Sequence, residues 1–135
     1  MKKYICIILI TLIFWGCSKE NPTLVKLVEP ANGALLDNNC SLEIEGDAEW
    51  FFDWEDFPIY ASSYQLYVKH STAQFPIIDK KGVIDSEYKF SLKGYILTDN
   101  AFDWTWKVRA RVNGSWTEWS ETRYFDVLTQ EAVCY

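Results

Sequence analysis

Between Asp103 and Val112 apolar and polar side chains alternate without a break, and no other run in the chain restricts the fold as strongly. The apolar set is Trp104, Trp106, Val108, Ala110 and Val112, and the polar set is Asp103, Thr105, Lys107, Arg109 and Arg111. Because successive side chains of a strand point to opposite faces, the run predicts a β-strand with one face in the core. The Asn113-Gly114 pair that follows tolerates positive φ and predicts a tight hairpin turn.

Shorter runs of strand length recur along the chain, separated by turn signals at the roughly 8–12-residue spacing of all-β folds. They cover Leu24–Val28, Cys40–Glu45, Glu49–Trp54, Tyr64–Lys69, Phe75–Asp79, Tyr88–Leu92 and Arg123–Leu128. No window keeps a helical period, and Phe, Trp and Tyr make up 17% of the residues, which favours strands. The pattern predicts one all-β domain over residues 24–128, an antiparallel β-sandwich of seven or eight strands.

The first residues differ from the rest of the chain. A basic start at Lys2 and Lys3 precedes an apolar run over residues 4–15, which has the length of a signal-peptide core and is too short to span a bilayer. Gly16-Cys17 and a polar segment follow, and together these features resemble the signal of bacterial lipoproteins. The alternatives are an ordinary signal peptide cleaved near Gly16, or an uncleaved anchor.

The lipoprotein resemblance implies that residues 1–16 are a removable signal peptide and that Cys17 carries acyl chains such as palmitate. Residues 17–23 would then form a short polar tether. We expect the domain to be lipid-anchored to the outer membrane, on its periplasmic or its cell-surface side.

The remaining cysteines fit an exported protein. Cys6 lies in the signal peptide, so Cys40 and Cys134 are left as an even pair in an oxidising compartment. We predict a disulfide between them, which would tie down the C-terminal tail at residues 129–135. The alternative is two buried free thiols.

The charge balance limits the partners. Asp and Glu number 19 against 13 Lys and Arg, a net charge of −6 that becomes −8 once Lys2 and Lys3 leave with the signal peptide. Such a charge disfavours nucleic acid and favours a partner with a basic patch.

Catalytic and metal-binding patterns are weak. The single histidine, His70, is expected at the surface, and no Cys-x-x-Cys pair suggests zinc. Asp53, Glu55 and Asp56 lack the loop glycine of a calcium-binding loop. We therefore expect no catalytic activity, no metal and no cofactor.

Trp116 and Trp119 lie three residues apart, so an extended polyproline-like segment would place both indoles on one side. The outer face of the preceding strand carries Lys107, Arg109 and Arg111. Interleaving these groups gives cation–π stacking. We interpret the set as a structural ladder that rigidifies the last hairpin; the alternative is a ligand-binding face.

The chain resembles fibronectin type III domains of bacterial surface lipoproteins. The features that carry this resemblance are the Asp103–Val112 strand, the Asn113-Gly114 turn and the segment with Trp116 and Trp119. Trp54 on an early strand and Glu29-Pro30-Ala31-Asn32-Gly33 near the start add to it. The resemblance implies an immunoglobulin-like sandwich and specifies no ligand. Trp104 occupies the position of a tyrosine whose hydroxyl bonds to the backbone in that family. That hydrogen bond is therefore expected to be absent or to come from the indole N–H.

The densest aromatic cluster runs from Glu49 to Tyr60, and Trp50, Phe51 and Tyr60 are its candidate binding residues. Aromatic rings exposed among carboxylates suit a sugar face. We expect a non-catalytic protein-interaction or scaffolding module of the cell envelope, with an envelope protein as partner. The alternative is a carbohydrate-binding accessory lipoprotein. Buried rings at these three positions would favour scaffolding.

Overall fold

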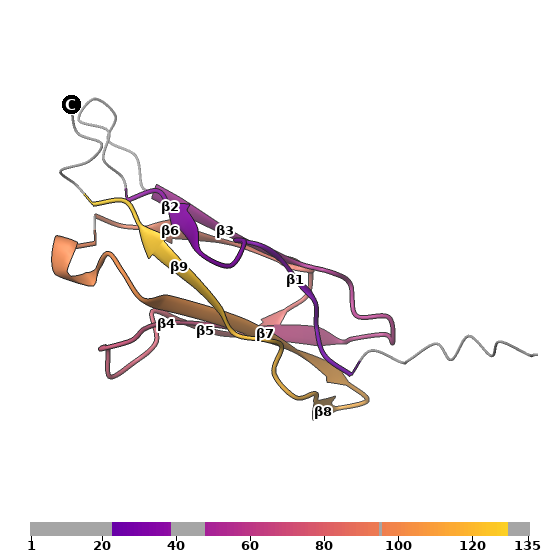
Figure 1. Ribbon diagram of the computed structural model, residues 1–135. Helices are drawn as coiled ribbons and strands as arrows, with labels where there is room; N and C mark the ends of the chain where they lie inside the picture. Colours follow the sequence, from indigo (N-terminus) through magenta and orange to yellow (C-terminus); the bar gives the residue numbers. More distant parts are fainter. Residues whose placement is uncertain (1–22, 39–47, 95, 130–135) are drawn as a thin grey trace, which may run out of the picture.

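The computed structural model describes residues 23–38, 48–94 and 96–129, which form two β-sheets packed face to face (Figure 1). The smaller sheet has the order β1-β3-β6, with β1 at Leu27–Glu29, β3 at Ala48–Trp54 and β6 at Glu87–Leu92. The larger sheet has the order β2-β9-β7-β4-β5, and β8 also pairs with β7. Its bounds are β2 Ala34–Leu36, β4 Ser63–His70, β5 Ile78–Val83, β7 Trp104–Val112, β8 Ser115–Trp116 and β9 Arg123–Val127. A 3-10 turn, η1, covers Thr98–Asn100. The predicted all-β sandwich is confirmed.

Large aromatic side chains fill the space between the sheets. On β3, Trp50, Phe52 and Trp54 are at most 1% exposed, because alternation turns every second residue inward. Phe52 packs against Trp106 of β7 with 5.3 Å between ring centroids, and Trp50 packs edge-on against Phe125 of β9 at 5.4 Å. Burial of this much aromatic surface is the main stabilising term of the domain.

Two short strands raise the count within the described residues to nine, where seven or eight were predicted. β2 has three residues and β8 has two, which is too short for an alternating pattern to be recognised in the sequence. β2 runs parallel to β9, whereas the other strand pairs of the described part are antiparallel. The strand predicted at Cys40–Glu45 lies outside the described residues.

The fifth strand begins later than predicted. β5 covers Ile78–Val83, where the sequence suggested Phe75–Asp79, and Phe75 is 72% exposed in the loop before it. Gly82 has a φ of +76° at a β-bulge, where the register with β4 shifts. The bulge keeps Val83 buried after the exposed residues that precede it.

Candidate interaction surface

The outer face of the larger sheet carries a row of cations. Lys107, Arg109 and Arg111 occupy alternate positions of β7, between residues that point into the core. The register places Tyr67 and Gln65 of β4 opposite Lys107 and Arg109 respectively. β7 pairs with β4 on one side and with β9 on the other. The three positive side chains therefore lie on an inner strand of the sheet.

The segment after β8 runs along the edge of β7 without forming a regular strand. Thr117 N–H donates to Ala110 O at 2.9 Å, and Ser120 N–H donates to Val108 O at 2.8 Å. The two hydroxyls complete the pairing, because Thr117 Oγ1 accepts from Ala110 N–H and Ser120 Oγ accepts from Val108 N–H. The backbone is thus anchored every third residue, which places Trp116 and Trp119 on the same side of the segment.

The cations and the aromatic rings interleave. The Lys107 ammonium lies 5.4 Å from the Tyr67 ring centroid and 4.7 Å from that of Trp119. The Arg109 guanidinium lies between two indoles, at 4.5 Å from Trp119 and 4.9 Å from Trp116, and Arg111 lies 5.8 Å from Trp116. We call these six side chains the ladder, and each stacked cation in it contributes roughly 0.5–1 kcal/mol.

Gln65 holds Arg109, the central cation of the ladder, through a hydrogen bond. Its side chain is 3% exposed, its Oε1 accepts from Arg109 Nε at 2.9 Å, and its amide donates to Asp79 of β5. Neither Gln65 nor Tyr67 was predicted from the sequence as part of the ladder. The only indication in the sequence was that both residues lie on the polar face of the Tyr64–Lys69 run. Their role in the ladder depends on how β4, β5 and β7 are aligned.

The ladder cations have no acidic partner among the residues that the structure describes. The ion pairs found there join Lys26 to Glu55 and Arg123 to Glu121. Within the same residues, the terminal nitrogens of Arg109 form no hydrogen bond, since its one bond uses Nε. Stacking covers the faces of this guanidinium and leaves its in-plane donors available.

The candidate aromatics Trp50, Phe51 and Tyr60 do not form one platform. Trp50 is 1% exposed and its indole N–H donates to Asp37 O at 2.9 Å, so its ring faces the core and is no longer a binding candidate. Phe51 is half-buried on the opposite face of β3, beside a shallow groove. Tyr60 is 86% exposed in the loop that precedes β4.

The hydrogen bond expected at Trp104 comes from its indole. Trp104 Nε1 donates to Asn100 O at 2.7 Å, which ties the start of β7 to η1. This is the second of the two arrangements considered from the sequence.

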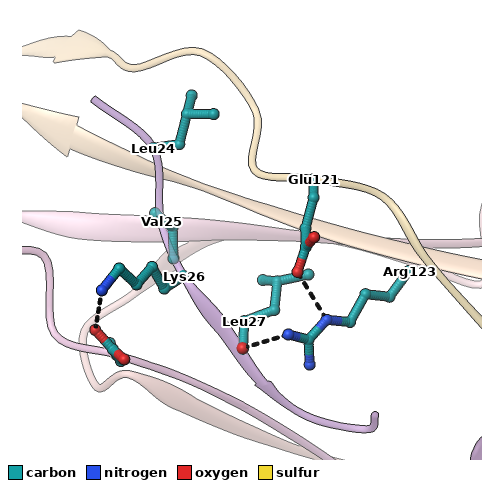
Figure 2. Close-up of a pocket in the computed structure, with 7 residues that line it drawn as sticks. Leu24, Val25, Lys26, Leu27, Glu121 and Arg123 are labelled. Atoms are coloured by element: carbon teal, nitrogen blue, oxygen red, sulfur yellow. Dashed lines mark hydrogen bonds and ion pairs between the residues drawn. The ribbon is translucent and has the colours of Figure 1, made fainter. Parts of the chain in front are cut away.

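A groove of about 370 Å³ lies between the N-terminal segment and the chain leading into β9, as Figure 2 shows. Its four charged side chains form two ion pairs. Lys26 pairs with Glu55 at 3.5 Å on one side, and Arg123 donates to Glu121 at 2.9 Å and to Leu27 O at 2.7 Å on the other. The Arg123 guanidinium is therefore occupied, whereas the exposed pair of Lys26 and Glu55 holds its two groups only weakly.

His70 is buried, and the expectation that it lies at the surface is wrong. It is 6% exposed, because it ends β4 on the inward face, in register with Trp104. The two rings pack edge-on at 5.1 Å, and His70 Nδ1 accepts from Thr72 N–H at 3.3 Å. These contacts give the imidazole a packing role.

Within the described ranges, no three His, Cys, Asp or Glu side chains are grouped so that they could hold a metal ion. No helix of that part of the chain is long and apolar enough to cross a membrane. Cys17, Cys40 and Cys134 lie outside the described residues, and so do the lipidation and the disulfide predicted for them.

Neither the protein-family models nor the curated proteins contain a match to this chain.

Proposed function

We propose that the protein is a non-catalytic interaction module of the bacterial cell envelope, with a fibronectin type III-like domain held at the membrane by a lipid on Cys17. The observation that carries the proposal is the outer face of the larger sheet. Its central strand β7 is paired on both sides, and the ladder holds its cations in defined positions. A face whose side chains are already held in place loses little conformational entropy on binding, which suits a protein partner.

The engaged groups of the groove in Figure 2 support the same proposal. A site for a small polar ligand usually presents convergent polar groups that are available to bind it. Here Arg123 is occupied by backbone carbonyls and by Glu121. The sheet face keeps available donors, so we place the partner there.

The test is affinity capture from detergent-solubilised envelopes, with the full chain as bait and chemical crosslinking before solubilisation. We expect one protein partner to be recovered in stoichiometric amount. Recovery of no such partner would contradict the proposal, and binding of a glycan on an array would then favour carbohydrate binding.

Carbohydrate binding is retained as a second candidate because of Tyr60, whose ring is 86% exposed. The ladder indoles do not support it. Trp116 and Trp119 each lie against cations, which leaves less of their faces for a sugar ring. Tyr60→Ala separates the two functions, because it should abolish a glycan signal and leave capture of a protein partner unchanged.

A further inference from the structure

We infer that the outer face formed by β4, β5 and β7 binds an acidic, extended segment of a partner protein. The cations of the face would contact the carboxylates of that segment. The inference rests on the proposed function and names the chemistry of the partner. It differs from the expectation drawn from net charge, which pointed to a basic partner.

The charge of this face is opposite to that of the whole chain. β7 contributes Lys107, Arg109 and Arg111, and the register adds Lys69 of β4 next to Thr105 and Lys81 of β5 next to Gln65. Asp79 is the one carboxylate on the same face of these three strands, and the Gln65 amide donates to it. On the outer face of these three strands, a chain with a net charge of −6 thus places five cations and one acid.

The donors on this face are available. Among the described residues no carboxylate lies within ion-pair distance of the ladder cations, and the terminal nitrogens of Arg109 have no hydrogen-bond partner. Arg123 provides the contrast, because its terminal nitrogens donate to Val28 O, Pro30 O and Leu27 O. Gln65 and the two indoles hold the Arg109 side chain in place, so ordering it for a ligand costs little.

The geometry favours carboxylates on an extended chain. A guanidinium presents a planar fork that matches a carboxylate with two parallel hydrogen bonds. Alternate residues of a strand are about 6.7 Å apart, so the spacing along β7 equals that of alternate side chains on an extended partner. An acidic segment with carboxylates at every second residue can therefore pair with Lys107, Arg109 and Arg111 in succession.

β5 offers a matched pair of variants for the test. Lys81 lies opposite Gln65 on the outer face, whereas its neighbour Lys80 lies opposite the buried Leu66 and therefore on the other side of the strand. Both lysines are exposed. Lys81→Glu and Lys80→Glu change net charge equally and differ only in the face that they alter.

The experiment measures fluorescence anisotropy of a labelled octapeptide, (Glu-Ser)4, titrated with the full chain in a nonionic detergent. The (Gln-Ser)4 peptide and polygalacturonate are measured in parallel, and thermal unfolding confirms that each variant is folded. We expect binding of (Glu-Ser)4 that weakens as salt rises and no binding of (Gln-Ser)4. Lys81→Glu should weaken binding about fivefold or more, as expected for loss and reversal of one charge contact, and Lys80→Glu less than about twofold.

Equal effects of the two variants would overturn the inference, since net charge would then account for the binding. Binding of (Gln-Ser)4 as tightly as (Glu-Ser)4 would do the same. Tighter binding of polygalacturonate, with the same dependence on Lys81, would assign the face to an anionic glycan and overturn the protein partner.

Affinity capture with Lys81→Glu as bait separates this inference from the proposed function. If the variant still recovers the partner that the unaltered chain recovers, the module binds through another surface and only the inference fails. If the unaltered chain recovers no partner, the proposed function fails, whatever the peptide does.

Discussion

Replacing Arg123 with Ala should remove the main polar connection between the two sheets at the N-terminal edge. Arg123 begins β9, and its terminal nitrogens donate to Val28 O at 2.9 Å, to Pro30 O at 3.4 Å and to Leu27 O at 2.7 Å. Its Nε donates to Glu121. The side chain of Arg123 is 19% exposed, so these bonds are partly shielded from water.

The magnitude follows from the two short bonds. A hydrogen bond from a charged donor contributes about 1.5–3 kcal/mol. The 3.4 Å contact with Pro30 O adds little, and the pair with Glu121 is discounted because that carboxylate is 61% exposed. In the variant, water can reach part of the freed carbonyls, so we expect the free energy of unfolding to fall by about 2–3 kcal/mol.

Urea unfolding followed by tryptophan fluorescence measures this loss. With a slope of about 1.5 kcal/mol per molar urea, the midpoint of Arg123→Ala should fall by about 1–2 M. Arg123→Lys keeps the charge on a single nitrogen that cannot reach all the carbonyls, so it should lose about half as much. Arg111→Ala is the control, since Arg111 is exposed, stacks on Trp116 at 5.8 Å, and its side chain makes one hydrogen bond within the described residues, of 3.3 Å to Gly114 O. A midpoint for Arg123→Ala no lower than that of Arg111→Ala would refute the role assigned to Arg123.

Four further changes test other parts of the structure. Ser120→Ala removes the hydroxyl that accepts from the backbone of the buried β7, so urea unfolding should show a loss of about 1–3 kcal/mol, and an unchanged midpoint would contradict this pairing. Trp104→Phe should be more destabilising than Trp106→Phe by about 1 kcal/mol in thermal unfolding, because the Trp104 indole N–H has a hydrogen-bond partner in the described structure and the Trp106 indole N–H has none; equal losses would contradict this. Gly82→Ala should lose about 1 kcal/mol, measured by urea unfolding, through its φ of +76° alone, because an added Cβ would meet no atom within 4 Å; a gain in stability would speak against the bulge. Cys17→Ala should release the protein from membranes or leave the precursor uncleaved, and unchanged processing and fractionation would rule out lipidation.

Most of the fold could be predicted because period-two alternation assigns the faces of long strands. The Asp103–Val112 run predicted all four residues that β7 buries, which are Trp104, Trp106, Val108 and Ala110, while Val112 is half-buried. β2 and β8 could not be predicted, because pairing with a neighbouring backbone defines them and their own side chains carry no pattern. β5 was misplaced because its lysines and Gly82 are typical of a turn, whereas the strand lies at a sheet edge where lysine is well tolerated.

The candidate surface could be predicted only in part. The three-residue spacing of Trp116 and Trp119 predicted that both indoles lie on one side, next to the cations of β7, and the structure has this arrangement. The role of Gln65 depends on the register of three strands, which the local sequence does not encode. Net charge was also a poor guide to local charge, because three cations share one face of β7 and the pairing with β4 and β5 adds Lys69 and Lys81 to them.

Arg109 and Arg123 show why the surface had to be identified from contacts. Both are half-buried arginines on strands of the same sheet. The alternation of β7 predicted the stacking of Arg109, whereas nothing in the sequence predicted the hydrogen bonds that Arg123 makes. Arg123 uses its in-plane donors on carbonyls and a carboxylate, so its charge contributes to folding. Arg109 is held by ring faces and by one bond to Gln65, which orient the guanidinium and leave its terminal nitrogens available. The interactions that rigidify the ladder are therefore compatible with binding, and the structural ladder and the ligand-binding face inferred from the sequence are not exclusive alternatives.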